Sequence, residues 1–235
     1  MKAIIVAAGE GKRLQPLTLT CPKPMVPLLG KPILHHIWEI VPVEVDEVLL
    51  VVGSGWRGEI IRNYFGSEFL GKKIVYLVQE SFLGTGHAVR LALPHLAPHE
   101  RVLIMYADDL HHAPSIQKLL EHSLGMLVCQ VLDPRRFGVV VTDKTGVVVG
   151  LEEKPENPKS DLAAIGVYVL DRETLEIEPS LQPNGEYYIN DMILWATKNK
   201  VVHTVQTEFW HPIGYPEDVL TAEEVLKQRN ASKNK

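Results

Sequence analysis

Cysteine is scarce in this chain of 235 residues, and long apolar runs are absent. The two cysteines, Cys21 and Cys129, lie far apart without a C-x-x-C spacing, so they give no disulfide framework and favour a reducing, cytoplasmic location. No apolar run approaches the roughly 20 residues that span a bilayer, so we expect no membrane partner. The apolar run near the N-terminus is short and is followed by charged residues, which argues against a signal peptide.

Basic residues do not dominate the composition either. The chain has 24 lysines and arginines against 29 aspartates and glutamates, and its net charge is −5. This balance predicts no broad basic surface and therefore no nucleic-acid partner. The cations near the N-terminus, among them Lys12, Arg13 and Lys23, are a local exception in an acidic protein. A local cluster of this kind suits a small anionic ligand.

Short apolar runs alternate with helical patterns in the first half of the chain. The expected strands are 3–7, 47–52, 73–78 and 101–106, and the expected helices are 33–40, 59–65 and 84–93. This alternation predicts an α/β fold with a mostly parallel, doubly wound (Rossmann-like) sheet that is covered on both faces. Ligands of such sheets bind at the carboxyl ends of the strands, near the point where the strand order reverses.

The pattern becomes strand-rich after Gly125. We expect strands at 126–132, 139–142, 147–151 and 163–170, and closing helices at 189–198 and 217–228. No flexible linker separates the two halves, so we interpret residues 1–228 as a single domain. The polar residues 229–235 are expected to form a frayed tail.

Residues 8–13 read A-G-E-G-K-R and follow the first apolar run. Gly9 and Gly11 let the backbone approach a ligand and point its N–H groups inward. The cations that follow complete what a polyphosphate needs. Two familiar glycine motifs do not fit, because a P-loop needs a glycine five residues before Gly11 and a Ser or Thr after Lys12, and the dinucleotide fingerprint needs a glycine where Leu14 stands.

The whole opening stretch fits a third pattern. A-A-G-x-G-x-R-L-x-P-x-T, followed by K-P-M-x-P, resembles the motif of the sugar-1-phosphate nucleotidylyltransferases, or NDP-sugar pyrophosphorylases. The resemblance covers residues 3 to about 217, nearly the whole chain. It implies a nucleotide-binding loop formed by Ala8, Gly9, Gly11 and Lys12. Arg13 would hold the outer phosphates and the leaving pyrophosphate, and Lys23 would neutralise the α-phosphate.

Residues 79–88, Q-E-S-F-L-G-T-G-H-A, follow the third expected strand. A glutamine amide offers one acceptor and two donors, which suits the edge of a base. The segment also resembles the base-recognition segment of the uridylyltransferases in the same family. That resemblance places Gln79, Gly84 and Thr85 on the base and ribose, and it favours uracil or thymine as the base.

The fourth expected strand ends in Tyr106-Ala107-Asp108-Asp109. A carboxylate at the carboxyl end of a strand is a natural Mg²⁺ ligand, since Mg²⁺ takes one or two carboxylates together with phosphate oxygens. The family has Gly-Asp at this place, so we assign Asp108 to the metal and interpret Asp109 as a capping or solvated residue. The following histidines, His111 and His112, are interpreted as exposed loop residues rather than as a transition-metal site.

Two later segments resemble the sugar-phosphate side of the same family, so the strand-rich half is expected to bind the sugar. In R-R-F-G and L-E-E-K-P, the resemblance implies that Gly138 contacts the sugar, Glu153 binds its hydroxyls and Lys154 holds its phosphate. Gly185 to Asp191 resembles a further sugar-pocket segment and adds Tyr188.

Two positions depart from the family pattern. Ala164 stands where enzymes for N-acetylglucosamine 1-phosphate often have Asn, so glucose 1-phosphate is favoured over the acetamido sugar. Pro212 stands where the W-x-D-x-G motif usually supplies a second metal carboxylate. The left-handed β-helix of the bifunctional uridylyltransferase–acetyltransferases is not present in these 235 residues.

Together these features predict a transferase that moves a nucleoside monophosphate from UTP or dTTP to a sugar 1-phosphate and releases pyrophosphate. Its substrates are the NTP and the sugar phosphate, its cofactor is Mg²⁺, and a homo-oligomer is left open. Two alternatives also remain open. One is a cytidylyl- or guanylyltransferase acting on another phosphorylated sugar or alcohol. The other is a non-catalytic nucleotide-sugar-binding regulatory protein, for which Pro212 would be the argument.

Overall fold

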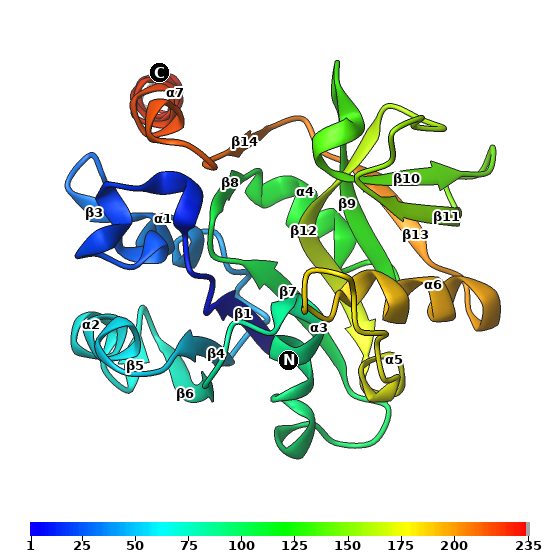
Figure 1. Ribbon diagram of the computed structural model, residues 1–235, viewed down its shortest axis with the longest axis horizontal. Coiled ribbons are helices and arrows are strands. Elements are labelled where there is room, and N and C mark those ends of the chain that lie inside the picture. The colour runs from blue at the N-terminus through cyan, green and yellow to red at the C-terminus, as the bar shows by residue number, and fades with distance from the viewer. Residues whose placement is uncertain (234–235) are drawn as a thin grey trace.

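A mixed sheet of ten strands runs through the computed structural model, which describes residues 1–233 (Figure 1). Eight strands follow the order β11-β10-β12-β7-β1-β4-β6-β5, and β9 and β13 branch off β12. The strands are β1 (Lys2–Ala7), β4 (Glu47–Gly53), β5 (Glu68–Phe69), β6 (Lys72–Gln79), β7 (Arg101–Tyr106), β9 (Gly125–Gln130), β10 (Gly138–Thr142), β11 (Val148–Glu153), β12 (Leu162–Asp171) and β13 (His203–Gln206).

The parallel half of the sheet has β1 at its centre. The strand β4 pairs with one side of β1 and β7 with the other, and both pairings are parallel. Since β6 lies beyond β4, the strand order reverses between β1 and β7. The carboxyl ends of these strands, near Ala8 and Asp108, therefore flank the crevice in which a doubly wound sheet binds ligands.

Helices cover both faces of the sheet, as the alternation of apolar runs predicted. Alternate residues of β1 point to opposite faces, so Ala3 and Ile5 belong to one buried cluster and Ile4 to the other. The first cluster packs beneath α1 (Ile33–Trp38), α2 (Trp56–Phe65), α4 (Ala113–Leu119) and α7 (Pro216–Lys233). The second packs beneath α3 (Gly84–Arg90), α5 (Arg172–Glu176) and α6 (Ile189–Asn199). The predicted α/β class with a doubly wound sheet is confirmed.

The strand-rich half is antiparallel and continuous with the parallel half. The long strand β12 pairs antiparallel with β7, β9 and β10. Its register with β9 shifts between Ala164 and Tyr168, and Gly166 in between has a φ of 74°. A Cβ at Gly166 would lie 2.5 Å from the Tyr106 ring, so this bend needs glycine. The bend lies opposite the carboxyl end of β7, because Val167 pairs with Met105.

Several elements differ from the sequence prediction. The short strands β8 (Asp109–His111) and β14 (Trp210–Pro212) pair antiparallel with each other, and β2 (Pro27–Leu28) pairs with β3 (Lys31–Pro32). Strands of two or three residues are too short to show an alternation, so the sequence did not reveal these pairings. The last helix, α7, continues to Lys233, so the expected tail 229–235 begins inside a helix, and residues 234–235 lie outside the described part of the chain.

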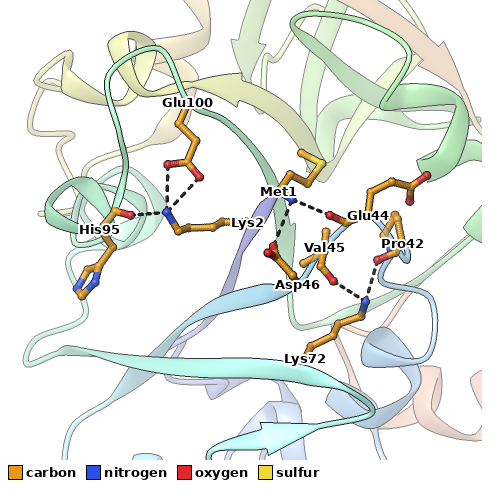
Figure 2. Close-up of polar contacts among 9 residues, drawn as sticks. All are labelled: Met1, Lys2, Pro42, Glu44, Val45, Asp46, Lys72, His95 and Glu100. Atoms are coloured by element: carbon orange, nitrogen blue, oxygen red, sulfur yellow. Dashed lines mark hydrogen bonds and ion pairs between the residues drawn. The ribbon is translucent and has the colours of Figure 1, made fainter.

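Ionic and polar contacts stabilise the sheet at the amino-terminal ends of its parallel strands (Figure 2). Lys2 Nζ lies 3.1 Å from Glu100 Oε2, which links β1 to the turn before β7. The buried Lys72 donates to the carbonyls of Pro42 and Val45, both at 2.8 Å, and burial lowers its pKa. Within residues 1–233, no helix combines the length and apolar character needed to cross a bilayer.

Candidate active site

A first cavity of about 400 Å³ opens at the carboxyl ends of β1 and β6. It contains every residue that the sequence assigned to the nucleotide. Its lining comprises Val6, Ala8, Gly9, Glu10, Gly11, Lys12, Arg13, Leu14, Lys23, Gln79, Phe82, Gly84, Thr85, Asp108, Glu186 and Gly214.

The glycine-rich loop between β1 and the first 3-10 turn forms one wall of this cavity. Gly11 has a φ of 74°, and a Cβ there would lie 3.1 Å from Thr18 Cγ2 and 3.2 Å from Lys23 Cβ. The Thr18 hydroxyl also donates to the Gly11 carbonyl at 2.8 Å. The loop is thus packed closely enough to place the Lys23 side chain, while Lys12 points outward and pairs with Glu10 at 2.8 Å.

Gln79 is buried at the carboxyl end of β6 and has a fixed orientation. Its amide nitrogen lies 3.0 Å from the Gly84 carbonyl and 3.0 Å from His87 Nδ1. Burial lowers the pKa of His87, so its ring is neutral at pH 7 and Nδ1 can accept this hydrogen bond. Both amide protons are then used within the protein, and the side-chain oxygen of Gln79 is left to meet a ligand.

The segment that follows Gln79 packs against the predicted sugar-side segment. A Cβ at Gly84 would lie 2.6 Å from the Tyr187 carbonyl, and the Gly86 N–H donates to the same carbonyl at 2.8 Å. The Thr85 hydroxyl accepts from the Ile189 N–H at 3.3 Å, at the start of α6. Glycine is therefore required here for contact between the two segments, which places the base side and the sugar side next to each other.

A second cavity of about 360 Å³ adjoins the first and shares lining residues with it, among them Arg13, Lys23, Thr85 and Asp108. It contains every residue assigned to the sugar phosphate. Its remaining lining comprises Tyr106, Asp109, Arg136, Phe137, Gly138, Glu153, Lys154, Ala164, Ile165, Gly166, Tyr168, Glu186, Tyr188, Asn190, Trp210, Pro212, Gly214 and Asp218.

Glu153 is the centre of the polar contacts in the second cavity. Its Oε2 accepts from Asn190 Nδ2 at 2.9 Å, and its Oε1 lies 2.9 Å from Lys154 Nζ. A Cβ at Gly138 would lie 3.3 Å from Glu153 Oε2 and 3.6 Å from Ala164 Cβ, so the small residues keep the space beside the carboxylate open. Lys154 has a φ of 45°, an unfavourable conformation for a non-glycine residue that is found preferentially at functional sites.

Three tyrosines complete the walls of the second cavity. Tyr106 and Tyr168 lie edge to face with ring centroids 5.9 Å apart, and burial raises the pKa of both hydroxyls. They therefore remain protonated and can donate hydrogen bonds. The predicted Tyr188 lies at the same cavity, where its hydroxyl is 2.7 Å from Asn184 Nδ2.

Asp108, the predicted metal ligand, lies on the wall that the two cavities share. Its Oδ2 is 3.0 Å from Lys23 Nζ, and the Lys23 side chain is 12% exposed against 41% for Asp108. Within residues 1–233, no three His, Cys, Asp or Glu side chains are placed to hold a metal ion together. Pro212 lines the second cavity without a ligating group. A metal here would therefore take one carboxylate from Asp108 and its other ligands from the substrate and water.

The prediction that Asp109 is a capping or solvated residue is wrong. Asp109 is half-buried and accepts from Trp210 Nε1 at 2.9 Å and from the Ile213 N–H at 3.0 Å. Burial, together with the neighbouring Asp108 charge, raises its pKa to about 7. Its donors come from β14 and the residues after it, about a hundred positions along the chain, so no local pattern could show this role.

The prediction that His111 is an exposed loop residue is also wrong. His111 belongs to β8, is 5% exposed, and its two buried ring nitrogens have no hydrogen-bond partner among residues 1–233. Burial lowers its pKa to about 4, so the ring is neutral at pH 7. His112 is half-buried, with Nδ1 3.0 Å from the Ser115 hydroxyl.

The sequence assigned no site role to four polar residues of the second cavity: Arg136, Glu186, Asn190 and Asp218. Arg136 lies next to the predicted Gly138 segment, and Asn190 lies within the tyrosine-containing segment, so proximity to those motifs was an available signal. Asp218 had no such signal. Its Oδ2 accepts from the N–H groups of Gly214 and Tyr215 at 2.8 Å and thereby fixes the chain before α7.

Comparisons with known proteins agree on one family. The family model described as nucleotidyl transferase matches residues 2–229. The bifunctional protein GlmU of Methanocaldococcus jannaschii is 37% identical over 96% of this chain, and the chain spans about half (54%) of that relative's length. The UTP–glucose-1-phosphate uridylyltransferase AglF of Haloferax volcanii is 33% identical, with 97% of each chain covered.

Solved structures agree with the fold. A protein from Bacillus anthracis, assigned as a glucose-1-phosphate thymidylyltransferase and crystallised with sucrose, superposes with a TM-score of 0.84 at 25% identity over 96% of this chain and 94% of that one. A UDP-glucose pyrophosphorylase complexed with UDP-glucose superposes with a TM-score of 0.83 at 23% identity, over 97% and 98% of the two chains. This chain belongs to the nucleotidyl transferase family, among the sugar-1-phosphate nucleotidylyltransferases that its motifs resemble.

Proposed function

We propose that this protein transfers a nucleoside monophosphate from an NTP to a sugar 1-phosphate and releases pyrophosphate. The observation that carries the proposal is the pair of adjoining cavities with a shared wall that includes Arg13, Lys23 and Asp108. One cavity has the glycine-rich loop, and the other has the Glu153 and Lys154 pair. Two anionic substrates bound in them would meet at a wall that carries the charges their reaction needs.

The base is a uracil or thymine, so UTP or dTTP is the favoured nucleotide. The fixed Gln79 amide supports this assignment, because its free oxygen can accept the imide N–H that both bases carry. Cytosine has an acceptor at the equivalent position and would leave that oxygen unpaired. The thymine methyl group distinguishes the two favoured bases by only about 1–3 kcal/mol in a pocket.

The sugar is glucose 1-phosphate rather than its N-acetylamino relative. Ala164 lines the second cavity with a methyl group and offers no hydrogen bond to an acetamido substituent. Glu153 is the acceptor for sugar hydroxyls, and Asn190 and Lys154 orient its two oxygens.

Transfer consists of an in-line attack by a phosphate oxygen of the sugar 1-phosphate on the α-phosphorus of the NTP. Catalysis is positioning and charge neutralisation, because two anions must approach each other. Lys154 holds the sugar phosphate, Lys23 neutralises the α-phosphate and Arg13 stabilises the leaving pyrophosphate. The wall between the two cavities supplies both Lys23 and Arg13.

The carboxylate of Asp108 is a suitable ligand for a Mg²⁺ ion. Asp108 with phosphate oxygens and waters is an acceptable Mg²⁺ shell, and Mg²⁺ when bound would withdraw charge from the phosphates. Asp109 is less suited as a second ligand, because each of its carboxylate oxygens already accepts a hydrogen bond, one from Trp210 Nε1 and one from the Ile213 N–H.

Pyrophosphate release with a panel of NTPs and sugar 1-phosphates tests the proposal. We expect the highest kcat/KM for UTP or dTTP with glucose 1-phosphate. A preference for CTP or GTP would move the protein to the cytidylyl- or guanylyltransferases, and a large preference for the acetamido sugar would overturn the sugar assignment. Binding of nucleotide sugars without any turnover would identify a regulatory protein.

A further inference from the structure

Two neighbouring arginines of the sugar side have different surroundings. Arg135 is bound to Asp133 through two contacts, Nε to Oδ1 and Nη2 to Oδ2, both 2.8 Å. Arg136 instead lines the second cavity, and its Cζ lies 5.1 Å from the centroid of the Tyr215 ring. Arg135 is therefore neutralised within its own turn, whereas Arg136 brings its charge to the cavity.

The Tyr215 ring also contacts Arg13. Arg13 Cζ lies 5.9 Å from the ring centroid, so one aromatic ring holds a guanidinium from the nucleotide loop and another from the sugar side. The backbone of Tyr215 is fixed in turn, because its N–H donates to Asp218 Oδ2 at 2.8 Å. Tyr215 thus contacts one cation from the nucleotide loop and one from the sugar side.

Arg13 and Arg136 differ from the other cations of the two cavities in forming no direct ion pair, although the charge of Arg136 acts on Asp133. The remaining pairs are Lys12 with Glu10, Lys23 with Asp108 and Lys154 with Glu153. Within residues 1–233, neither Arg13 nor Arg136 forms an ion pair. Neither guanidinium is neutralised by an ion pair, so both can bind phosphate oxygens.

We propose that Arg136 is a further substrate-binding residue that holds the phosphate group of the sugar 1-phosphate together with Lys154. Arg136 lines the second cavity only, whereas Arg13 lines both, so Arg136 serves the acceptor and Arg13 the nucleotide. A guanidinium forms two parallel hydrogen bonds with phosphate oxygens. A phosphate monoester carries close to two negative charges, and Lys154 shares its charge with Glu153, so a second cation is needed. This inference rests on the proposed function and names a residue of its acceptor site.

The test compares Arg136→Ala with Arg135→Ala, a matched control that removes the same side chain from the neighbouring, Asp133-paired position. Arg136→Ala should raise the KM for glucose 1-phosphate about ten- to a hundredfold, as expected for losing a charged hydrogen-bonding partner. The KM values for the NTP and, in the reverse direction, for pyrophosphate should stay within about twofold of the wild type. Arg136→Lys keeps the charge but cannot form two parallel hydrogen bonds, so its KM for glucose 1-phosphate should lie between those of Arg136→Ala and the wild type. Arg135→Ala should have the KM of the wild type.

Two kinetic outcomes would overturn the inference. One is an Arg136→Ala variant that matches Arg135→Ala, and the other is a larger effect on pyrophosphate or NTP than on the sugar phosphate. Calorimetry with glucose 1-phosphate separates this inference from the proposed function. If the wild type shows no transfer with any substrate pair, the proposed function fails, and binding that Arg136→Ala loses and Arg135→Ala keeps would still support the phosphate site. Absence of any glucose 1-phosphate binding by the wild type would overturn the site as well.

Discussion

Lys23 Nζ lies 3.0 Å from Asp108 Oδ2 on the wall between the two cavities. Lys23, which is proposed to bind the α-phosphate, is thus paired with Asp108, which is proposed to bind the metal ion. A nucleotide that draws Lys23 onto its phosphate would free Asp108 to bind a metal ion carried by the same nucleotide. Nucleotide and metal are therefore expected to bind together rather than separately.

Mg²⁺ alone should bind weakly to the protein, because Lys23 competes for the one carboxylate available. Replacing Lys23 with Met should strengthen binding of Mg²⁺ to the nucleotide-free protein, and Asp108→Asn should abolish that gain. Calorimetry of Mg²⁺ with the three proteins measures this directly. Tight Mg²⁺ binding by the wild type that survives Asp108→Asn would mean that the metal sits elsewhere.

Arg13→Ala should slow transfer by roughly 10²–10³, because a donor to charge that develops during the reaction is lost. The side chain is exposed and its contact with Tyr215 is long, so the melting temperature should change little. Lys144→Ala, in an exposed turn outside both cavities, is the control for general surface effects. Near-normal turnover of the Arg13 variant would show that the loop has a structural role only.

His87→Ala should reduce the selection of UTP over CTP. The neutral ring of His87 holds the Gln79 amide, so its loss lets the amide rotate and offer either its oxygen or its nitrogen to the base. A positioning effect of this kind should lower the ratio of kcat/KM for UTP to that for CTP by about tenfold. An unchanged ratio with a lower overall rate would contradict the role of His87 in positioning Gln79.

His111→Leu should stabilise the protein, most strongly below pH 6.5. Burial lowers the pKa of His111 from 6.5 to about 4, so between these values the unfolded chain takes up a proton that the folded chain does not. Stability conferred by the neutral ring is therefore present above pH 6.5 and is lost as the pH falls towards 4. Melting temperatures from pH 4.5 to 8 should show a flatter acid side for the variant.

The exposed His95→Leu is the control for the His111 experiment, since solvent surrounds its ring. It should leave the pH dependence of the melting temperature unchanged. A His111→Leu variant with the same acid sensitivity as the wild type would show that other groups cause the loss of stability.

Local sequence patterns were sufficient to predict the parallel half of the sheet. An apolar run between glycines specifies a buried strand, and β1 and β4 begin and end within one residue of their predicted bounds. The motif residues at the strand ends, such as Gly11, Gln79 and Asp108, line the cavities, and their binding roles stay predictions. These features could be read because strand ends and their loops are adjacent in sequence.

The long-range contacts that set the charge states and positions of site residues could be identified only in the tertiary structure. Asp109 accepts hydrogen bonds from Trp210 and Ile213, which lie about a hundred residues along the chain. Arg13 and Arg136 contact the same ring, that of Tyr215, although all three lie far apart in sequence. The strands β8 and β14 are too short to show alternation, yet their pairing buries His111 and places Asp109 opposite Pro212. The sequence by itself determined which chemical groups reach the site, and the long-range packing decided their charge states, because burial and partners set a pKa while residue type alone does not.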